Sequence, residues 1–460
     1  MQKKSSWLKY TVEQRDFLEG LSRDYRAFLD AGKTERECVA EAVEQAEKRG
    51  FVNLEARLKS PGALKPGEKI YVNCMDKSLA LFVTGKRPLE EGLNVIAAHI
   101  DSPRLDAKPN PIGEEEGICY LDTHYYGGIK KYQWLAMPLA MHGVAVRKDG
   151  SRVNIVVGED EDDPVLGISD LLPHLDHEQD GKKVSDAFKG EKLDVILASA
   201  PLKDVEKDAV KESLLKILED KYAIREEDLL SSEIEIVPAG KARDFGLDRS
   251  MIIAYGHDDR CCSYPSMRAL FDLDEIPEKT CVCILTDKEE IGSVGASGMR
   301  ASYFTNAVAE LIAMQTQFTE IKLRRALANG NVLSCDVSAA FDPKYPEPFE
   351  KKNAAFLGHG LALSKYTGSR GKSGSNDASC EYIASLRSIF DEAGADYQLC
   401  EMGAVDAGGG GTIAYILALY GMNVIDAGLA VLSMHAPWEI ISKADLYESY
   451  TAYKAFLINA

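Results

Sequence analysis

Hydrophobic and polar positions along the chain follow two different periods. Apolar side chains recur every three or four positions in residues 11–50 and again in 443–458, a spacing that is typical of helices with one buried face. From residue 93 onward, short apolar runs of strand length alternate with stretches of helical spacing. This alternation predicts an α/β fold with a mostly parallel sheet and helices on both of its faces. We expect strands in 93–98, 251–255, 280–286, 332–335 and 422–432, and further helices in 302–317 and 378–393.

The stretch between residues 107 and 245 interrupts this alternation. It contains clusters of turn-forming residues, strand-like runs such as Val153–Val157, and a charged helical stretch near 204–221. We therefore expect an inserted, smaller, β-rich domain at 107–245. The flanking segments, 1–106 and 246–460, are expected to form the α/β domain together.

Composition narrows the range of functions. The 460 residues include 54 Lys and Arg against 73 Asp and Glu, a formal net charge of −19, which argues against nonspecific nucleic-acid binding. Ten cysteines are too few for a disulfide scaffold and favour reduced thiols. No apolar run reaches about 18 residues and the chain begins with a charged stretch. We therefore expect neither a transmembrane helix nor a signal sequence, no membrane partner, and a cytoplasmic location.

An imidazole or a carboxylate follows each expected strand. Because ligands of α/β sheets gather at the carboxyl ends of the strands, we expect these side chains to converge. Several carboxylates with two histidines leave negative charge unbalanced unless cations are present, which predicts a site for two divalent ions. Mixed nitrogen and oxygen donors favour zinc, with cobalt or manganese as alternatives, over magnesium or calcium. The side chains concerned are His99, Asp101, Asp258, Asp259, Glu289, Glu290, Asp336 and His435.

Each of these residues also has a purely structural interpretation. A single buried histidine such as His99 is more often a packed residue than a ligand, and the pair Asp258–Asp259 could cap a helix. The pair Glu289–Glu290 could be an exposed acidic turn, but it follows an apolar run and precedes a glycine-rich stretch. Neighbouring side chains on an extended chain diverge, so one glutamate could bind metal while the other accepts a proton from water.

Five short segments carry a further signal. They are His-Ile-Asp-Ser-Pro-Arg at 99–104, Asp-Asp-Arg at 258–260, Asp-Lys-Glu-Glu-Ile-Gly-Ser at 287–293, Ser-Cys-Asp-Val at 334–337 and Met-His-Ala at 434–436. Together and in this order, they resemble the motifs of the aspartyl aminopeptidase and vacuolar aminopeptidase I family. The resemblance runs over nearly the whole chain. It implies a dinuclear metallo-aminopeptidase that hydrolyses the N-terminal residue from peptide substrates.

The resemblance also implies a role for each matched residue. Asp101 orients His99, and Glu289 is the general base. The family forms a homo-oligomer, a tetrahedral dodecamer, so the insert is expected to be an oligomerisation domain. The implied metal ligands are His99 and Asp336 for one ion, Glu290 and His435 for the other, and Asp259 as the bridge between them, with Asp258 as the weaker choice.

Three further positions match family segments that bind substrate. Either His174 or His177 resembles a histidine that reaches a neighbouring subunit's site, although both could be surface residues. Lys365 resembles a basic residue near the first side chain of the substrate, and it could equally be solvated. The residues after Gly368 depart from the aspartyl-specific pattern, so both an acidic and a neutral first residue stay open. The glycine run 408–411 lacks a P-loop ending and suits either a tight turn or a backbone close to substrate.

Two other classes of function compete with an aminopeptidase. A deacylase or carboxypeptidase could use a similar dinuclear centre, and it would accept peptides with a blocked N-terminus. A noncatalytic shell with a peptidase-like fold would need no intact ligand set, whereas every ligand type is present in this chain. The sequence therefore favours the aminopeptidase.

Overall fold

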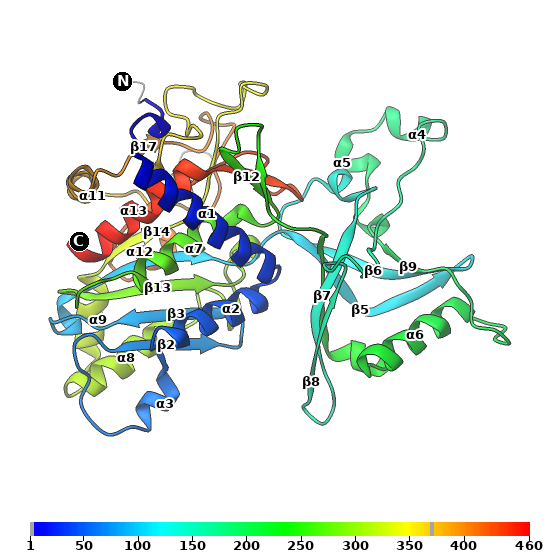
Figure 1. Ribbon diagram of the computed structural model, residues 1–460, viewed down its shortest axis with the longest axis horizontal. Helices are drawn as coiled ribbons and strands as arrows, with labels where there is room; N and C mark the ends of the chain where they lie inside the picture. The colour runs from blue at the N-terminus through cyan, green and yellow to red at the C-terminus, as the bar shows by residue number, and fades with distance from the viewer. Residues whose placement is uncertain (1–3, 369–371) are drawn as a thin grey trace. The chain divides into compact units, whose positions relative to one another are not determined.

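The computed structural model describes residues 4–368 and 372–460, which form two compact units (Figure 1). The large unit comprises the chain up to Asp101 together with Ala242–Met434 and Glu439–Ala460, and the small unit comprises Ser102–Lys241 and His435–Trp438. The sequence predicts an insert at 107–245, and the role of that insert in oligomerisation stays a prediction.

A nine-stranded sheet forms the centre of the large unit. Its four middle strands run parallel and an antiparallel pair flanks them on each side, so the sheet is mixed, although five of its eight strand pairs are parallel. The predicted α/β fold is confirmed at this level. In spatial order the strands are β1 (Val52–Asn53), β2 (Lys69–Cys74), β3 (Ser78–Val83), β13 (Thr280–Thr286), β4 (Leu93–His99), β14 (Asn331–Ser334), β18 (Asn423–Gly428), β16 (Leu361–Ser364) and β17 (Tyr397–Cys400).

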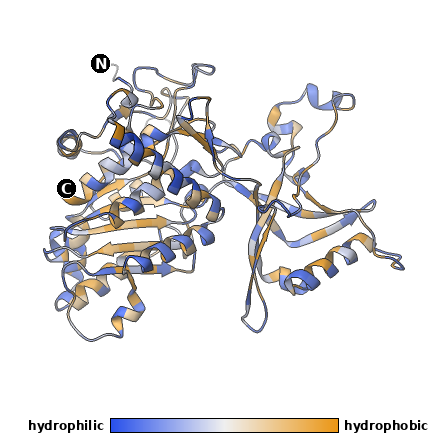
Figure 2. Ribbon diagram, viewed as in Figure 1, coloured by the Kyte–Doolittle hydropathy of each residue, from blue (hydrophilic) through white to orange (hydrophobic). Residues whose placement is uncertain are grey.

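Helices cover both faces of this sheet, and each layer buries its own apolar core. In Figure 2 the strands of this sheet are coloured mainly as hydrophobic, whereas the helices that cover it show both hydrophobic and hydrophilic residues. A two-sided core explains the near-continuous apolar runs of the middle strands. One face carries α1 (Val12–Ala31), α2 (Glu35–Lys48), α7 (His257–Phe271), α11 (Cys380–Ala393) and α13 (Lys443–Asn459), and the other α3 (Leu54–Leu58), α8 (Tyr303–Gln315), α9 (Glu320–Ala328) and α12 (Ala414–Ala418).

One predicted strand lies outside the nine-stranded sheet. Residues 251–255 do form a strand, β12 (Met251–Ala254), but it pairs antiparallel with β11 (Arg243–Phe245) and β20 (Glu439–Ser442) in a separate small sheet. The expectation that all five strand ends share one sheet is therefore wrong for β12, and also for the residues before His435, because Ala430 and Val431 pair outside the nine-stranded sheet. The apolar pattern of β12 indicates a strand but not the strand's partners, which depend on the distant segment β20. A short parallel pair, β15 (Ser338–Ala339) with β19 (Ala430–Val431), completes the large unit.

The small unit is a six-stranded antiparallel sheet with one long helix. Residues Val210, Leu214 and Leu218 of α6 (Ala209–Tyr222) pack with Cys119 of the sheet in a small apolar cluster. Two short helices, α4 (His177–Asp180) and α5 (Val184–Ala187), lie in the long connection before the last edge strand. In spatial order the strands are β8 (Arg152–Val157), β7 (Leu139–Val146), β10 (Ser232–Pro238), β5 (Arg104–Glu115), β6 (Ile118–Tyr126) and β9 (Val195–Ala198).

Two further expectations concern the whole chain. All ten cysteines are free thiols, which agrees with the prediction that the chain is not a disulfide scaffold. Among the residues that the structure describes, no helix is long and apolar enough to cross a bilayer.

Candidate metal centre and substrate pocket

Three neighbouring strands deliver the first group of polar side chains. His99 is the last residue of β4, and it pairs in register with Thr286, the last residue of β13. Immediately beyond β13, a 3-10 turn, η6 (Glu289–Ile291), carries the two glutamates. On the other side of β4, Asp336 follows the end of β14. Parallel strands end at the same edge of the sheet, so these side chains meet as the sequence predicts.

The imidazole of His99 lies at the centre of this group. Its Nε2 is 3.2 Å from Asp258 Oδ1, and it is 4.0 Å from carboxylate oxygens of both Glu289 and Asp336. In three overlapping groups, one ligand atom from each residue lies within 4.8 Å of the others. These groups are His99 with Glu289 and Asp336, His99 with Asp258 and Glu290, and Asp258 with Asp259 and Asp336. They offer the mixed nitrogen and oxygen donors that suit zinc.

The adjacent residues Asp258 and Asp259 occupy different positions. Both are buried at the beginning of α7, where their backbone angles are not helical. The Asp258 carboxylate faces His99 Nε2, whereas Asp259 Oδ2 accepts a hydrogen bond of 3.2 Å from the backbone N–H of His99. Asp258 also shares ligand groups with both Glu290 and Asp336. Asp258 thus faces the imidazole of His99, whereas Asp259 contacts the backbone of the same residue.

Burial and charge both act on this group. Burial opposes the charge on His99, but hydrogen bonds to Asp101 and Asp258 outweigh it and raise the pKa of the imidazole well above its usual value. Burial also raises the pKa of Asp259 well above its usual range. The same cause, reinforced by the charge of Glu289, raises the pKa of Asp336. Several carboxylates this close together are costly without a cation, so the donor set fits a site for divalent metal.

Asp101 makes two kinds of contact in this region. Its backbone carbonyl oxygen accepts a hydrogen bond of 3.0 Å from His99 Nδ1, and its carboxylate oxygen Oδ1 lies 3.4 Å from the same nitrogen. The carboxylate also accepts hydrogen bonds from the backbone N–H groups of Glu289 and Glu290, at 3.1 and 3.2 Å. Asp101 is fully buried. The contacts with η6 were not predicted, because a sequence pattern carries no signal for a hydrogen bond to a backbone N–H.

His435, the remaining predicted ligand, belongs to the small unit by its contacts. Its backbone is left-handed, with φ of 63°, and its Nδ1 lies 2.8 Å from the carbonyl oxygen of Gly128. A hydrogen bond to one ring nitrogen is the usual means of fixing the tautomer of a metal-binding histidine. The role of His435 as a ligand stays a prediction from the sequence.

The predicted substrate-binding residues lie on the surface. His174 and His177 are exposed in the small unit, where His177 begins α4 and forms a group with Asp176 and Asp180. Lys365 follows β16 and is also exposed, with its Nζ 3.8 Å from Asp377. Their roles in binding substrate stay predictions. Residues 369–371, where the sequence departs from the aspartyl-specific pattern, lie outside the described residues.

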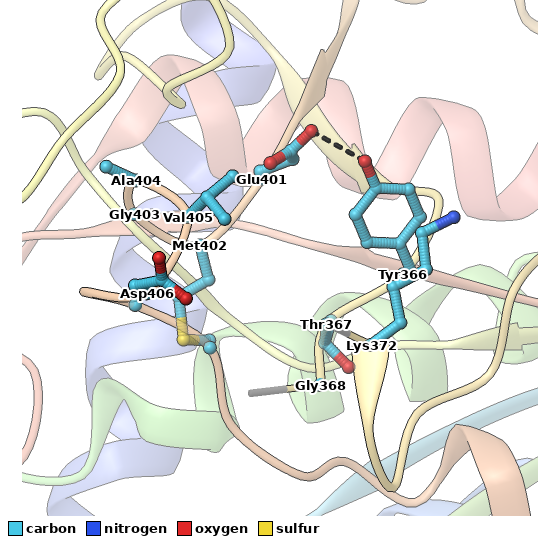
Figure 3. A pocket seen from close by; sticks show the side chains of 12 residues that line it. Tyr366, Thr367, Gly368, Lys372, Glu401, Met402, Gly403, Ala404, Val405 and Asp406 are labelled. Atoms are coloured by element: carbon cyan, nitrogen blue, oxygen red, sulfur yellow. Dashed lines mark hydrogen bonds between the residues drawn. The ribbon is translucent and has the colours of Figure 1, made fainter. Parts of the chain in front are cut away.

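A pocket of about 200 Å³ lies beside the segment that carries Lys365 (Figure 3). The hydroxyl of Tyr366 donates a hydrogen bond of 2.7 Å to Glu401, and Lys372 Nζ lies 3.9 Å from the centre of the Tyr366 ring. Met402 and Val405 add apolar surface. Of the predicted glycine run, Gly408 and Gly409 line the pocket. A side chain at Gly408 would meet the carbonyl oxygen of Met402 at 2.0 Å, so this turn needs glycine.

The pocket adds residues that sequence reasoning missed. Tyr366 directly follows the predicted Lys365, and Lys372 lies further along the same segment, so the sequence around Lys365 could have indicated both. Glu401 follows β17, and nothing in its sequence surroundings distinguishes it from a solvated glutamate.

The mixed α/β sheet and the histidine and carboxylate side chains gathered at its edge are of the kind that a metal-dependent hydrolase requires. A family model described as aminopeptidase I zinc metalloprotease (M18) matches residues 28–457. The chain therefore belongs to the M18 peptidase family, and it is an aminopeptidase, a hydrolase of the zinc metallopeptidase class. The predicted family and enzyme class are thus confirmed.

Individual relatives give the same result. The chain is 54% identical over 457 residues to a probable M18 family aminopeptidase 1 of Clostridium acetobutylicum. The aligned residues make up 99% of this chain and 98% of the relative. A crystal structure of an M18 family aminopeptidase from Thermotoga maritima is similar with a TM-score of 0.95 and 45% identity, over 100% of both chains. The S. cerevisiae mApe1 dodecamer shares the fold at 21% identity, with a TM-score of 0.78 over 96% of this chain and 97% of that one.

Proposed function

We propose that this aminopeptidase uses two divalent ions and that Glu289 is its general base. Zinc is the favoured metal, and cobalt and manganese are the alternatives. The observation that carries the proposal is the set of three overlapping groups around His99 and Asp258, which come from three strand ends and the start of α7; within each group the ligand atoms lie within 4.8 Å of one another. When bound, the ions supply Lewis acidity toward water and the scissile carbonyl group. Such a pair of ions would also balance the buried carboxylates.

The residues of the chain then divide the remaining tasks. His99 and Asp336 are proposed to hold one ion, and Glu290 and His435 the other. Asp258 replaces Asp259 as the proposed bridge, because Asp258 faces the imidazole of His99 whereas Asp259 accepts a backbone hydrogen bond.

Glu289 is only partly buried, and its carboxylate lies 4.0 Å from His99 Nε2. It can therefore reach both the ligand group and solvent. We propose that it accepts a proton from the attacking water and donates it to the leaving amine.

The pocket beside Tyr366 is proposed to receive part of the peptide substrate. Lys372 and the nearby Lys365 could attract an acidic side chain, whereas Met402 and Val405 suit a neutral one. Both an acidic and a neutral first residue therefore stay within the proposal. A panel of X-amide substrates, with X acidic, aliphatic or basic, decides between them. Peptides with an acetylated N-terminus test the deacylase alternative, and their cleavage would contradict an aminopeptidase.

The assembly and the location are also proposals. We propose a homo-oligomer, a dodecamer as in mApe1, in the cytoplasm. The exposed small-unit residues Leu171, Leu172 and Leu175 support contacts between subunits, because apolar side chains gain stability when another surface covers them. In such an assembly His174 or His177 is proposed to reach a neighbouring active site.

The general base is tested by the substitution Glu289→Gln. The amide keeps the size of the side chain but cannot accept the proton, so we expect kcat to fall by about 10²–10⁴-fold. Zinc content per subunit, measured by mass spectrometry of the metal, is expected to match the wild type. Glu310→Gln, on the exposed side of α8, is the control and should leave kcat unchanged. Wild-type turnover by the Glu289→Gln enzyme would refute the assignment.

A further inference from the structure

The turn η6 has an unusual anchor. Its first two residues, Glu289 and Glu290, are the proposed base and a proposed ligand, and both of their backbone N–H groups donate to the carboxylate of Asp101. The N–H groups of a first helical turn have no partner within the helix, so an outside acceptor holds them in place. The anchor is fully buried and comes from the neighbouring strand's end, two residues beyond His99.

The same residue holds His99 by a different atom. The imidazole Nδ1 is closer to the backbone carbonyl oxygen of Asp101, at 3.0 Å, than to its carboxylate, at 3.4 Å. The backbone carbonyl is present whatever the side chain at this position. The backbone carbonyl can therefore still hold His99 when the side chain is changed, whereas the carboxylate contacts the imidazole and also accepts from the backbone of η6 with both of its oxygens.

We infer that the Asp101 carboxylate, in addition to its contact with His99, is a positioning residue for the Glu289–Glu290 turn. The inference rests on the proposed function, since it assigns the carboxylate to the placement of the general base. A carboxylate offers acceptors on both oxygens, which is what two adjacent N–H groups require. No other side chain of similar size accepts on both branches.

The surroundings of the turn show why it needs this anchor. Lys288, which precedes it, and Gly292, which follows it, both have left-handed backbones, with φ of 68° and 93°. The turn is thus held between two sharp changes of chain direction. Its side chains must still be placed accurately, because an error of about 1 Å in a reacting group can cost about 10²-fold in rate.

The test is the substitution Asp101→Asn in the full-length, zinc-loaded enzyme. The asparagine side-chain oxygen can still accept a hydrogen bond from one of the two backbone N–H groups. Its NH₂ group is itself a donor, so the hydrogen bond to the other N–H group is lost. We expect kcat to fall by about 100-fold with KM within about threefold, because the base is displaced while substrate binding remains. Zinc content and zinc affinity should stay within a few-fold of the wild type, because the backbone carbonyl still holds His99. Backbone N–H groups in a peptide covering 287–292 should exchange with deuterium faster than in the wild type.

Asp445→Asn is a matched control. Asp445 is also a fully buried aspartate whose two carboxylate oxygens accept backbone N–H groups, those of Gly358 and Gly360, but it lies at the beginning of α13. The control should accelerate exchange around Gly358 and leave kcat near the wild-type value. This result would show that losing such an anchor does not by itself lower activity.

Two results would overturn the inference. One is unchanged exchange across 287–292 in Asp101→Asn, and the other is a large loss of zinc affinity, which would mean that the carboxylate acts through His99. Failure of the proposed function looks different: the wild type itself would then show no zinc-dependent release of N-terminal residues. The exchange and zinc measurements do not depend on turnover, so they test the anchor in either case.

Discussion

At the scale of single residues, the adjacent aspartates 258 and 259 make different contacts although their side chains are chemically identical. Asp258 and Asp259 are both buried carboxylates, yet only Asp258 Oδ1 approaches the imidazole of His99. The sequence predicted that this pair takes part in the site, and the resemblance pointed to Asp259. The backbone angles at the beginning of α7 decide which carboxylate faces the ligands, and a residue pattern contains no information on those angles.

This difference can be tested by exchanging one carboxylate at a time. We expect Asp258→Asn to lower the zinc content from two ions to one or fewer per subunit, because a neutral amide is a poor bridge between cations. Asp259→Asn should retain both ions, since its carbonyl oxygen can still accept the hydrogen bond from His99 N. Metal analysis after dialysis measures both variants. Loss of zinc in Asp259→Asn alone would restore Asp259 as the bridge.

At the scale of elements, the strand ends bring the ligands together. The register between β13 and β4 places Thr286 beside His99, so the turn after β13 must begin next to the end of β4. The apolar pattern predicted both strands and the turn after them. It did not predict that β12 pairs with β20 in a separate small sheet. A short apolar run indicates a buried strand, but it is the same whether the strand belongs to a small sheet or to the central one.

Helix caps offer a test of how local sequence acts on an element. Thr11 forms a capping box with Gln14 at the start of α1, whereas Thr319 at the start of α9 makes no such bond. We expect Thr11→Ala to destabilise the first turn of α1 by about 1 kcal/mol. Hydrogen exchange at Gln14 N–H should then accelerate about fivefold. Thr319→Ala is the control, and an equal acceleration at its own helix would contradict the role of the cap.

At the scale of the whole molecule, metal binding should stabilise the large unit more than the sheet of the small unit, to which only one proposed ligand, His435, belongs. The ligand group around His99 draws all of its described members from the large unit. Zinc at about 100 times its Kd is expected to stabilise that unit by about 2.7 kcal/mol. Hydrogen exchange of the chelated protein, before and after zinc is added, should slow more around β4 and β13 than in residues 139–157 of the small unit. Equal slowing in both units, or none, would contradict a site of this composition.

His99→Ala supplies the control for that measurement. Without the imidazole, the central donor of the group is missing, and added zinc should slow exchange much less. A response like that of the wild type would mean that zinc binds elsewhere on this acidic chain.

The sequence by itself determined the kinds of element and the chemistry of the site. Apolar periods reflect burial, and burial is already encoded in which positions must avoid water, so β4, β13, α8 and α11 could be predicted. The residue types that follow the strands likewise indicated a cation site. Only the tertiary structure decided that Asp258 rather than Asp259 faces His99, that Asp101 holds η6, and that Glu401 meets Tyr366. Those contacts join segments distant in the chain, and their geometry depends on the packing of the whole sheet and its connections.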